Sequence, residues 1–257
     1  MKRGLALFSV TTAVLLTTIL SSGCSLLRGH DDSAATLSVV VEPAHSAVTP
    51  VDRYEWWGKR HEAVKARVKE GNVDLIMIGD SITHGWENAG KVIWDQDYAP
   101  RNAVNMGFSG DRTQHVLWRL DHGEIDGISP KLAVIMIGTN NSNGNDNTAE
   151  EIADGIIAIV QTLRTELPGT KILLLAIFPR GPEPSPQREK NARASELAAK
   201  IADGEMIHYL DIGSEFLEPD GTLPKDIMPD FLHPNAKGYA IWAEAMEEKV
   251  AELMGEE

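Results

Sequence analysis

The 257-residue sequence contains a single cysteine, Cys24. One thiol cannot form an intrachain disulfide, and it cannot build a zinc or iron–sulfur site that needs several thiolates. Basic residues are also scarce, because 24 Lys and Arg stand against 38 Asp and Glu and give a formal net charge of −14. A phosphate backbone needs a basic protein surface, and so does electrostatic adsorption to anionic lipid. The charge balance therefore disfavours a nucleic-acid partner and adsorption to a membrane surface.

The short motifs of cofactor and metal chemistry are missing as well. No GxGxxG or Walker A string follows any apolar run, and no HExxH string or facial set of carboxylates occurs. The histidines His30, His45, His61 and His208 show no ligand spacing. We therefore expect no nucleotide, no cofactor and no catalytic metal.

The N-terminus has the pattern of an export signal. Lys2 and Arg3 precede a largely apolar run over residues 5–20, whose 16 residues fall short of the roughly 20 that span a bilayer. Small residues follow at 21–23, as in a cleaved signal. Cys24 comes next, and the arrangement resembles the lipobox of bacterial lipoproteins, although serine stands at position 21, where leucine is usual. A plain cleaved signal with an incidental cysteine is the alternative.

These features divide the chain into three predicted parts. A lipoprotein-type signal peptide covers residues 1–23, a flexible tether covers 24–50, and one folded domain covers 51–257. The tether mixes small, polar and aliphatic residues without a sustained period, and a flexible chain of this length spans roughly 30 Å. The expected location is outside the cytoplasm, with a lipid anchor holding the protein to the bacterial cell envelope, periplasmic or at the cell surface.

From residue 51 onward, short apolar runs alternate with helical periodicities. The runs predicted as strands cover 73–79, 103–107, 132–138, 171–177 and 206–212. The segments predicted as helices cover 54–70, 113–120, 149–167, 187–203 and 236–254. Such alternation favours an α/β fold of three α/β/α layers around a five-stranded parallel sheet. Ligands of such sheets bind at the carboxyl ends of the strands.

The polar residues at these strand ends suit acyl transfer. Ser81 directly follows a predicted strand, but a serine hydroxyl needs a base before it can act as a nucleophile. His233 is the best candidate base, and Asp230 stands three residues earlier, where a turn could orient the imidazole. Backbone N–H groups of Ser81 and Gly107 and the side-chain amide of Asn140 could stabilise an oxyanion.

Four sequence blocks resemble, in order, those of the SGNH (GDSL-type) hydrolases. They are GDSI (79–82), NMGFSG (105–110), GTNN (138–141) and DFLH (230–233). Longer stretches resemble the catalytic subunits of brain-type platelet-activating-factor acetylhydrolase, namely 110–131, 138–141 and 178–191. The resemblance covers nearly all of residues 52–253 and implies a flavodoxin-like fold. It also implies Ser81 as nucleophile, Asp230 and His233 as its partners, and Gly107 and Asn140 as oxyanion donors beside Ser81.

Several neighbouring residues have simpler explanations. His84 lies one turn after Ser81 and is the alternative base, but its side chain should lie along the helix. Asp80 is expected to hold the nucleophile turn through side-chain-to-backbone hydrogen bonds. Packing, ion pairing and loop shaping are the expected roles of Asp111, Arg112, His115, Trp118, Arg119 and His122.

The sequence as a whole predicts a serine esterase that hydrolyses small-acyl esters, acetyl above all. An O-acetylated carbohydrate is the expected substrate, because the protein is expected to be exported and tethered. The alternatives are an acetyl-phospholipid or lysophospholipid esterase, a non-catalytic glycan-binding protein on a hydrolase scaffold, and a flavin-binding redox protein, whose sheet order would be the same. A homodimer stays open.

Overall fold

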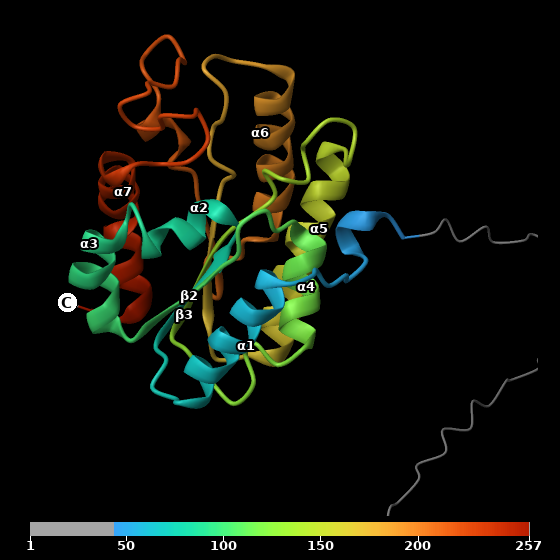
Figure 1. Cartoon of the computed structure of the whole chain (residues 1–257), viewed down its shortest axis with the longest axis vertical. Helices are drawn as coiled ribbons and strands as arrows, with labels where there is room; N and C mark the ends of the chain where they lie inside the picture. Colours follow the sequence, from blue (N-terminus) through green and yellow to red (C-terminus); the bar gives the residue numbers. More distant parts are fainter. Residues whose placement is uncertain (1–43, 257) are drawn as a thin grey trace, which may run out of the picture. The chain divides into compact units, whose positions relative to one another are not determined.

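The computed structural model describes residues 44–256, which are drawn in colour in Figure 1. The predicted export signal, Cys24 and most of the predicted tether lie outside the described residues. None of the helices within 44–256 combines the length and hydrophobicity that a bilayer crossing requires.

A five-stranded parallel sheet forms the centre of the domain (Figure 1). Its strands stand in the order β2-β1-β3-β4-β5, and every pairing is parallel. The strands are β1 (Leu75–Gly79), β2 (Ala103–Gly107), β3 (Leu132–Met136), β4 (Lys171–Leu175) and β5 (Ile207–Leu210). All residues of β1 and β3 are buried, as in strands covered by helices on both faces. The predicted parallel sheet is confirmed, and its order is the flavodoxin-like one.

Helices cover both faces of the sheet and complete the predicted three layers. The longer ones are α1 (Trp56–Lys69), α4 (Thr113–Asp121), α5 (Ala149–Glu166), α6 (Pro186–Ala198) and α7 (Ala236–Met254). Shorter elements are η1 (Ser46–Val48), α2 (Ser81–His84), η2 (Gly85–Glu87), α3 (Lys91–Ile93), η3 (Trp94–Tyr98), η4 (Ala99–Arg101), η5 (Ala199–Ile201) and η6 (Gly213–Phe216).

The two faces of the sheet bury two separate hydrophobic cores. Alternate residues of a strand point to opposite faces, so Ile76 and Ile78 of β1 join the core with α1, α4, α5 and α6. Leu75 and Met77 join the other core, which α7 covers together with the segment 82–98. The motifs at the strand ends are thus held by a sheet that is packed on both sides.

The helix ends follow local chemistry. The helix predicted over 54–70 begins at Trp56, because Glu55 before it has a φ of 57°, outside the helical range. The start of α5 is a capping box, with Thr148 accepting from the backbone of Glu151 and the Glu151 carboxylate accepting from the backbone of Thr148.

The last residues of the predicted tether, 44–50, pack against the folded domain. Ala47 in η1 is fully buried, and the Thr113 hydroxyl donates to its carbonyl at 2.8 Å. A Cβ on Gly155 of α5 would meet the same carbonyl at 2.8 Å, so glycine leaves room for this segment. Residues 44–50, which the sequence places in the tether, thus include a segment that packs on the domain.

Candidate active site

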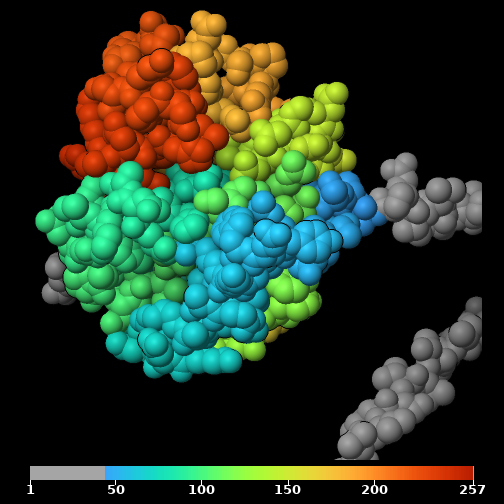
Figure 2. All heavy atoms as spheres, in the orientation of Figure 1, coloured from blue at the N-terminus to red at the C-terminus, as the bar shows by residue number. Residues whose placement is uncertain are grey.

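Three loops leave the sheet side by side at its carboxyl edge, after β1, β2 and β3. Gly79 at the end of β1 pairs with Gly107 of β2 on one side and with Met136 of β3 on the other. The first three sequence blocks therefore meet at one place. Figure 2 shows the segments that follow β4 and β5, in gold and orange-red, side by side at the upper end of the molecule. A hydrogen bond from Gly181 N to Phe231 O, at 2.8 Å, joins these two segments.

Ser81 is the first residue of α2 and is separated from the end of β1 by Asp80 alone. Asp80 is the N-cap, and its Oδ1 accepts a hydrogen bond from Ile82 N at 2.9 Å, as predicted for this turn. Tyr239 of α7 donates its hydroxyl to Ile82 O at 2.6 Å. The short helix is thus held at Ile82, the residue that follows Ser81. Its first N–H, that of Ser81, has no acceptor within the helix and is available to a ligand.

Ser81, His233 and Asp230 form a hydrogen-bonded chain. The Ser81 Oγ lies 2.8 Å from His233 Nε2, and His233 Nδ1 lies 2.6 Å from Asp230 Oδ2. A proton on Nδ1, facing the carboxylate, leaves the Nε2 lone pair free to accept the proton of the serine hydroxyl. The structure thus brings together the three residues that the sequence singled out, although they come from two segments about 150 positions apart.

We call residues 230–233 the Asp–His turn. Asp230 Oδ1 accepts hydrogen bonds from the backbone of Leu232 at 3.0 Å and of His233 at 2.7 Å, and Phe231 between them has a φ of 59°. Partial burial tends to raise the pKa of the Asp230 carboxyl, but the hydrogen bonds from His233 outweigh it and hold that pKa below its ordinary value. Asp230 is therefore both a turn residue and the partner of the imidazole, and it stays ionised.

The three predicted oxyanion donors differ in whether their N–H groups already donate a hydrogen bond within the protein. The amide of Asn140 spends one N–H on the carbonyl of Asp111, at 2.9 Å, and keeps a second. The N–H of Gly107 donates to Asn105 Oδ1 at 2.8 Å, so an oxyanion could use it only as a shared donor. Gly107 also has a steric role, because a Cβ there would lie 2.2 Å from the backbone nitrogen of His84.

His84 is not brought to the Ser81 hydroxyl. Its Nδ1 lies 2.9 Å from Ser109 Oγ, and its ring stacks on Trp56 at a centroid distance of 6.3 Å. Burial, and then the charge of Arg60, lower the pKa of His84. Within residues 44–256 it forms no hydrogen bond with Ser81, and the base available to Ser81 there is His233.

A fully buried ion cluster lies behind the loop that follows β2. We define this buried ion cluster as Asp111, Arg119 and Glu124, whose side chains are all inaccessible to solvent. Arg119 Nε donates to Asp111 at 2.9 Å, its Nη1 pairs with Glu124, and the guanidinium stacks on Phe108 at 4.0 Å. The expectation of packing and ion pairing in this segment is confirmed. Since Asp111 O accepts from Asn140, the cluster also positions that amide.

Asp80 carries a carboxyl group with no exposure to solvent. Burial raises its pKa to about 7, the hydrogen bond from Ile82 acts against this, and the charge of Asp111 adds to the rise. Its Oδ2 has no hydrogen-bond partner within the described residues. The nucleophile turn is therefore built on a carboxyl group that titrates near neutral pH.

Sequence reasoning missed Arg180, which follows β4 on the same edge. Its Nη1 donates to the carbonyl of Thr139 at 3.2 Å, to the Thr139 hydroxyl at 3.2 Å and to Asn143 Oδ1 at 3.1 Å. It thereby holds the loop that carries Asn140. No motif or spacing in the sequence links Arg180 to that loop, so only the fold could reveal the contact.

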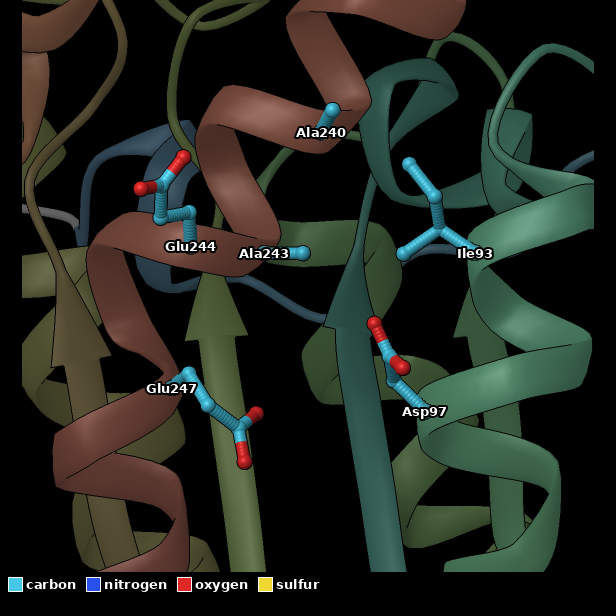
Figure 3. A pocket seen from close by; sticks show the side chains of 6 residues that line it. All are labelled: Ile93, Asp97, Ala240, Ala243, Glu244 and Glu247. Atoms are coloured by element: carbon cyan, nitrogen blue, oxygen red, sulfur yellow. The ribbon is translucent and has the colours of Figure 1, made fainter.

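A cavity of about 350 Å³ lies elsewhere, between α7 and the segment of α3 and η3 (Figure 3). Its lining residues are Ile93, Asp97, Ala240, Ala243, Glu244 and Glu247. Three of the six are carboxylates, and none is a predicted site residue. Within residues 44–256, no group of three or more His, Cys, Asp and Glu side chains is arranged to hold a metal ion.

The chain is similar to a family of known hydrolases. The model of the GDSL-like Lipase/Acylhydrolase family matches residues 77–241. Human platelet-activating factor acetylhydrolase IB subunit alpha2 is 38% identical over 204 residues, which cover 78% of this chain and 86% of that protein. The human alpha1 subunit is 36% identical over 202 residues, covering 78% and 85%.

Solved structures share the fold at lower identity. A GDSL-like lipase from Bacteroides thetaiotaomicron has a TM-score of 0.57 at 21% identity, covering 76% of this chain and 97% of that chain. An acetylxylan esterase from Geobacillus stearothermophilus has a TM-score of 0.56 at 21% identity, covering 73% and 96%.

Proposed function

This chain belongs to the GDSL-like lipase/acylhydrolase family and is an ester hydrolase, and on that premise we propose that it removes acetyl groups with Ser81 as its nucleophile. The observation that carries the proposal is the hydrogen-bonded chain from Ser81 through His233 to Asp230 at the carboxyl edge of the sheet. Hydrolase membership also removes the grounds for a flavin-binding protein and for a scaffold without activity.

The first half of the reaction forms an acyl-enzyme. His233 Nε2 takes the proton of Ser81 Oγ as that oxygen attacks the ester carbonyl carbon. The carbonyl oxygen gains negative charge and accepts hydrogen bonds from the Ser81 N–H and the free N–H of Asn140, with the Gly107 N–H as a shared third donor. Asp230 stabilises the imidazolium. The C–O bond to the alcohol then breaks, and the alcohol leaves with the proton from His233.

The second half releases the acid. A water molecule gives its proton to His233 Nε2 and attacks the acyl carbon. The same donors hold the oxyanion, the bond to Ser81 Oγ breaks, and His233 returns the proton to the serine. Free acetate and the starting enzyme result.

We take the alcohol part of the ester to be a carbohydrate. The curated relatives are acetylhydrolases by name, and a structural neighbour acts on acetylxylan, which supports an acetyl ester. Tyr54 is 86% exposed and Trp56 is 44% exposed. Trp56 stacks on His84, which contacts Ser109 in the loop after β2. Exposed aromatic rings on this segment, which Trp56 links to the loop after β2, could pack on the apolar faces of sugar rings.

An acetyl-phospholipid or lysophospholipid ester is the second candidate. Its support is the 38% identity to a protein named for hydrolysing the ester of platelet-activating factor. The same exposed rings of Tyr54 and Trp56 could meet lipid instead of sugar, so they do not separate the two candidates.

A direct test measures the acetate released by the full chain from several substrates. The panel contains acetylated xylan, acetylated pectin, acetylated peptidoglycan and vesicles of an acetyl-phospholipid, beside p-nitrophenyl esters of rising acyl length. Ser81→Ala serves as the matched blank. We expect the acetyl p-nitrophenyl ester and one of the glycans to be preferred. Turnover confined to the vesicles would replace the carbohydrate proposal by the lipid one, and equal rates with Ser81→Ala would refute the nucleophile.

We also propose that the protein is exported and anchored to the cell envelope through a lipid on Cys24. The support is the pattern of residues 1–24 alone. A lipid chain on Cys24 should place the protein in the membrane fraction, and Cys24→Ala should move it to the soluble exported fraction. Wild-type protein that is soluble and begins at another residue would refute the anchor.

A further inference from the structure

Arg180 presents an unused edge of its guanidinium beside the active site. Its Nη1 is engaged with Thr139 and Asn143, whereas its Nε and Nη2 have no acceptor among residues 44–256. It also forms no ion pair with any carboxylate of this part of the chain. In a protein with a formal charge of −14, carboxylates are abundant, so a half-buried arginine without one has a cationic edge left for a ligand.

Arg180 also lines a cavity of about 240 Å³. Arg180 and the loop after it line one side, and residues 230–232 of the Asp–His turn line the other. The hydrogen bond from Gly181 to Phe231 joins the two walls. Asp230 holds His233 from Nδ1 and Ser81 lies at Nε2, so a group bound in this cavity would be one imidazole ring away from the ester that Ser81 attacks.

Arg180 is the one cation among the residues that line this cavity, and the charges of Asp80 and Asp230 act on it without forming an ion pair within residues 44–256. Asp230 already accepts three hydrogen bonds, two from the backbone of the turn and one from His233. Asp80 is fully buried, and burial raises its pKa to about 7, so its carboxyl is partly neutral under ordinary conditions. An arginine stays protonated at such pH values, and its field acts on whatever enters the cavity.

We propose that Arg180 binds the carboxylate of an acidic sugar in the alcohol part of the substrate, an inference that rests on the proposed function. The acetyl group carries no ionisable group. The carboxylate that Arg180 binds must therefore belong to the alcohol part of the ester. The Nε and Nη2 donors form the planar fork that matches a carboxylate with two parallel hydrogen bonds. Ser185 and Gln187 add polar groups to the wall, which suit sugar hydroxyls better than lipid chains.

The test compares a charged and a neutral ester on the same enzymes. 4-Acetoxybenzoate carries a carboxylate on its alcohol part, and methyl 4-acetoxybenzoate is its neutral counterpart. The full chain, Arg180→Met and Arg193→Met are assayed with both. Arg193 lies exposed on α6 and pairs with Glu196, so its loss changes the net charge equally but leaves the cavity intact.

We expect the ratio of kcat/KM for the charged over the neutral ester to fall on the order of tenfold to a hundredfold in Arg180→Met, the range for hydrogen bonds to a charged group. Arg193→Met should keep the wild-type ratio. Arg180→Met also loses the contacts to Thr139 and Asn143. This loss should slow the hydrolysis of both esters by the same factor, which cancels in the ratio of their kcat/KM values. Acetylated pectin against acetylated xylan should show the same change.

Three results would overturn the inference. If Arg180→Met slows both esters equally, Arg180 only supports the loop of Asn140. If the dependence on Arg180 appears with 4-acetoxyphenyl phosphate and not with the carboxylate, the ligand is a phosphate and the sugar assignment is wrong. If the wild-type chain hydrolyses neither ester, the proposed function itself fails. In the first two cases the wild-type chain is active, so those results refute the inference alone.

Discussion

Two clusters of charged side chains occupy the carboxyl edge of the sheet, and they are built in opposite ways. The Asp–His turn is local in sequence and open to solvent, with 42% of the His233 side chain and 57% of the Asp230 side chain exposed. The buried ion cluster joins residues of α4 and its flanking loops with no exposure at all. One cluster has room for protons and substrate to move, whereas the other holds Asp111 O fixed beneath Asn140. The difference separates residues that would perform chemistry from residues that position it.

The comparison predicts the largest loss of activity at the exposed cluster. Ser81→Ala and His233→Gln should each lower kcat by on the order of 10⁴ or more, because each removes one member of a unit that acts together. Thermal unfolding should change little, since both side chains lie at the solvent edge. Steady-state kinetics beside a melting curve checks both statements. Near-wild-type turnover in either variant would refute the mechanism.

These two clusters also show what the sequence could and could not predict. Ser81, His233 and Asp230 were found because motif order and an i, i+3 spacing are visible in one dimension. Strand and helix positions were found because buried parallel strands have apolar runs. The link from Arg119 through Asp111 to Asn140 was missed, since it depends on contacts between loops that only the fold brings together. Asn105 sharing the Gly107 N–H was missed for the same reason.

The second prediction concerns stability at the buried cluster. Arg119→Met removes the cation between Asp111 and Glu124, so buried Glu124 loses its arginine, while Asp111 keeps only the longer contact with Arg53 and the hydrogen bond from Trp57. Breaking such a pair from one side costs about 3–5 kcal/mol of unfolding free energy. Lys91→Met removes an exposed pair with Asp95 and should cost about 1 kcal/mol or less. Denaturant unfolding of both variants is the measurement, and equal losses would contradict the contrast between buried and exposed charges.

The third prediction concerns the side-chain amide of Asn140. The buried ion cluster positions this amide, which acts in the same reaction as the Asp–His turn. Asn140→Ala removes a donor aimed at charge that develops only in the transition state, so kcat should fall by roughly 10²–10³ with little change in KM. Initial rates over a range of p-nitrophenyl acetate concentrations separate the two constants. A rise in KM at constant kcat would instead assign Asn140 to ground-state binding.

The fourth prediction concerns the pH dependence of stability through Asp80. Its folded pKa is raised to about 7 from an ordinary value of 3.8, so the folded chain binds more protons than the unfolded chain between these limits. Stability should therefore fall as pH rises from about 4 to 7. Asp80→Asn keeps the cap acceptor for Ile82 but cannot ionise. The unfolding free energy of Asp80→Asn relative to wild type should rise over this range by a few kcal/mol, about 1.4 for each unit of pKa. A constant difference at pH 4.5, 6 and 8 would show that Asp80 does not titrate there.

The smallest effect is expected at His84, whose imidazole could act as a base but lies against Ser109 and not against Ser81. His84→Gln keeps a polar group that can bond Ser109 but cannot accept a proton near neutral pH. Because the Ser81 hydroxyl lies against His233 instead, most activity should remain and the acidic limb of the pH–rate profile should persist. His233→Gln should abolish that limb along with nearly all turnover. An inactive His84→Gln beside an active His233→Gln would reverse the assignment of the base and leave Ser81 standing, and the exposed cluster would then be a turn that merely resembles a catalytic pair.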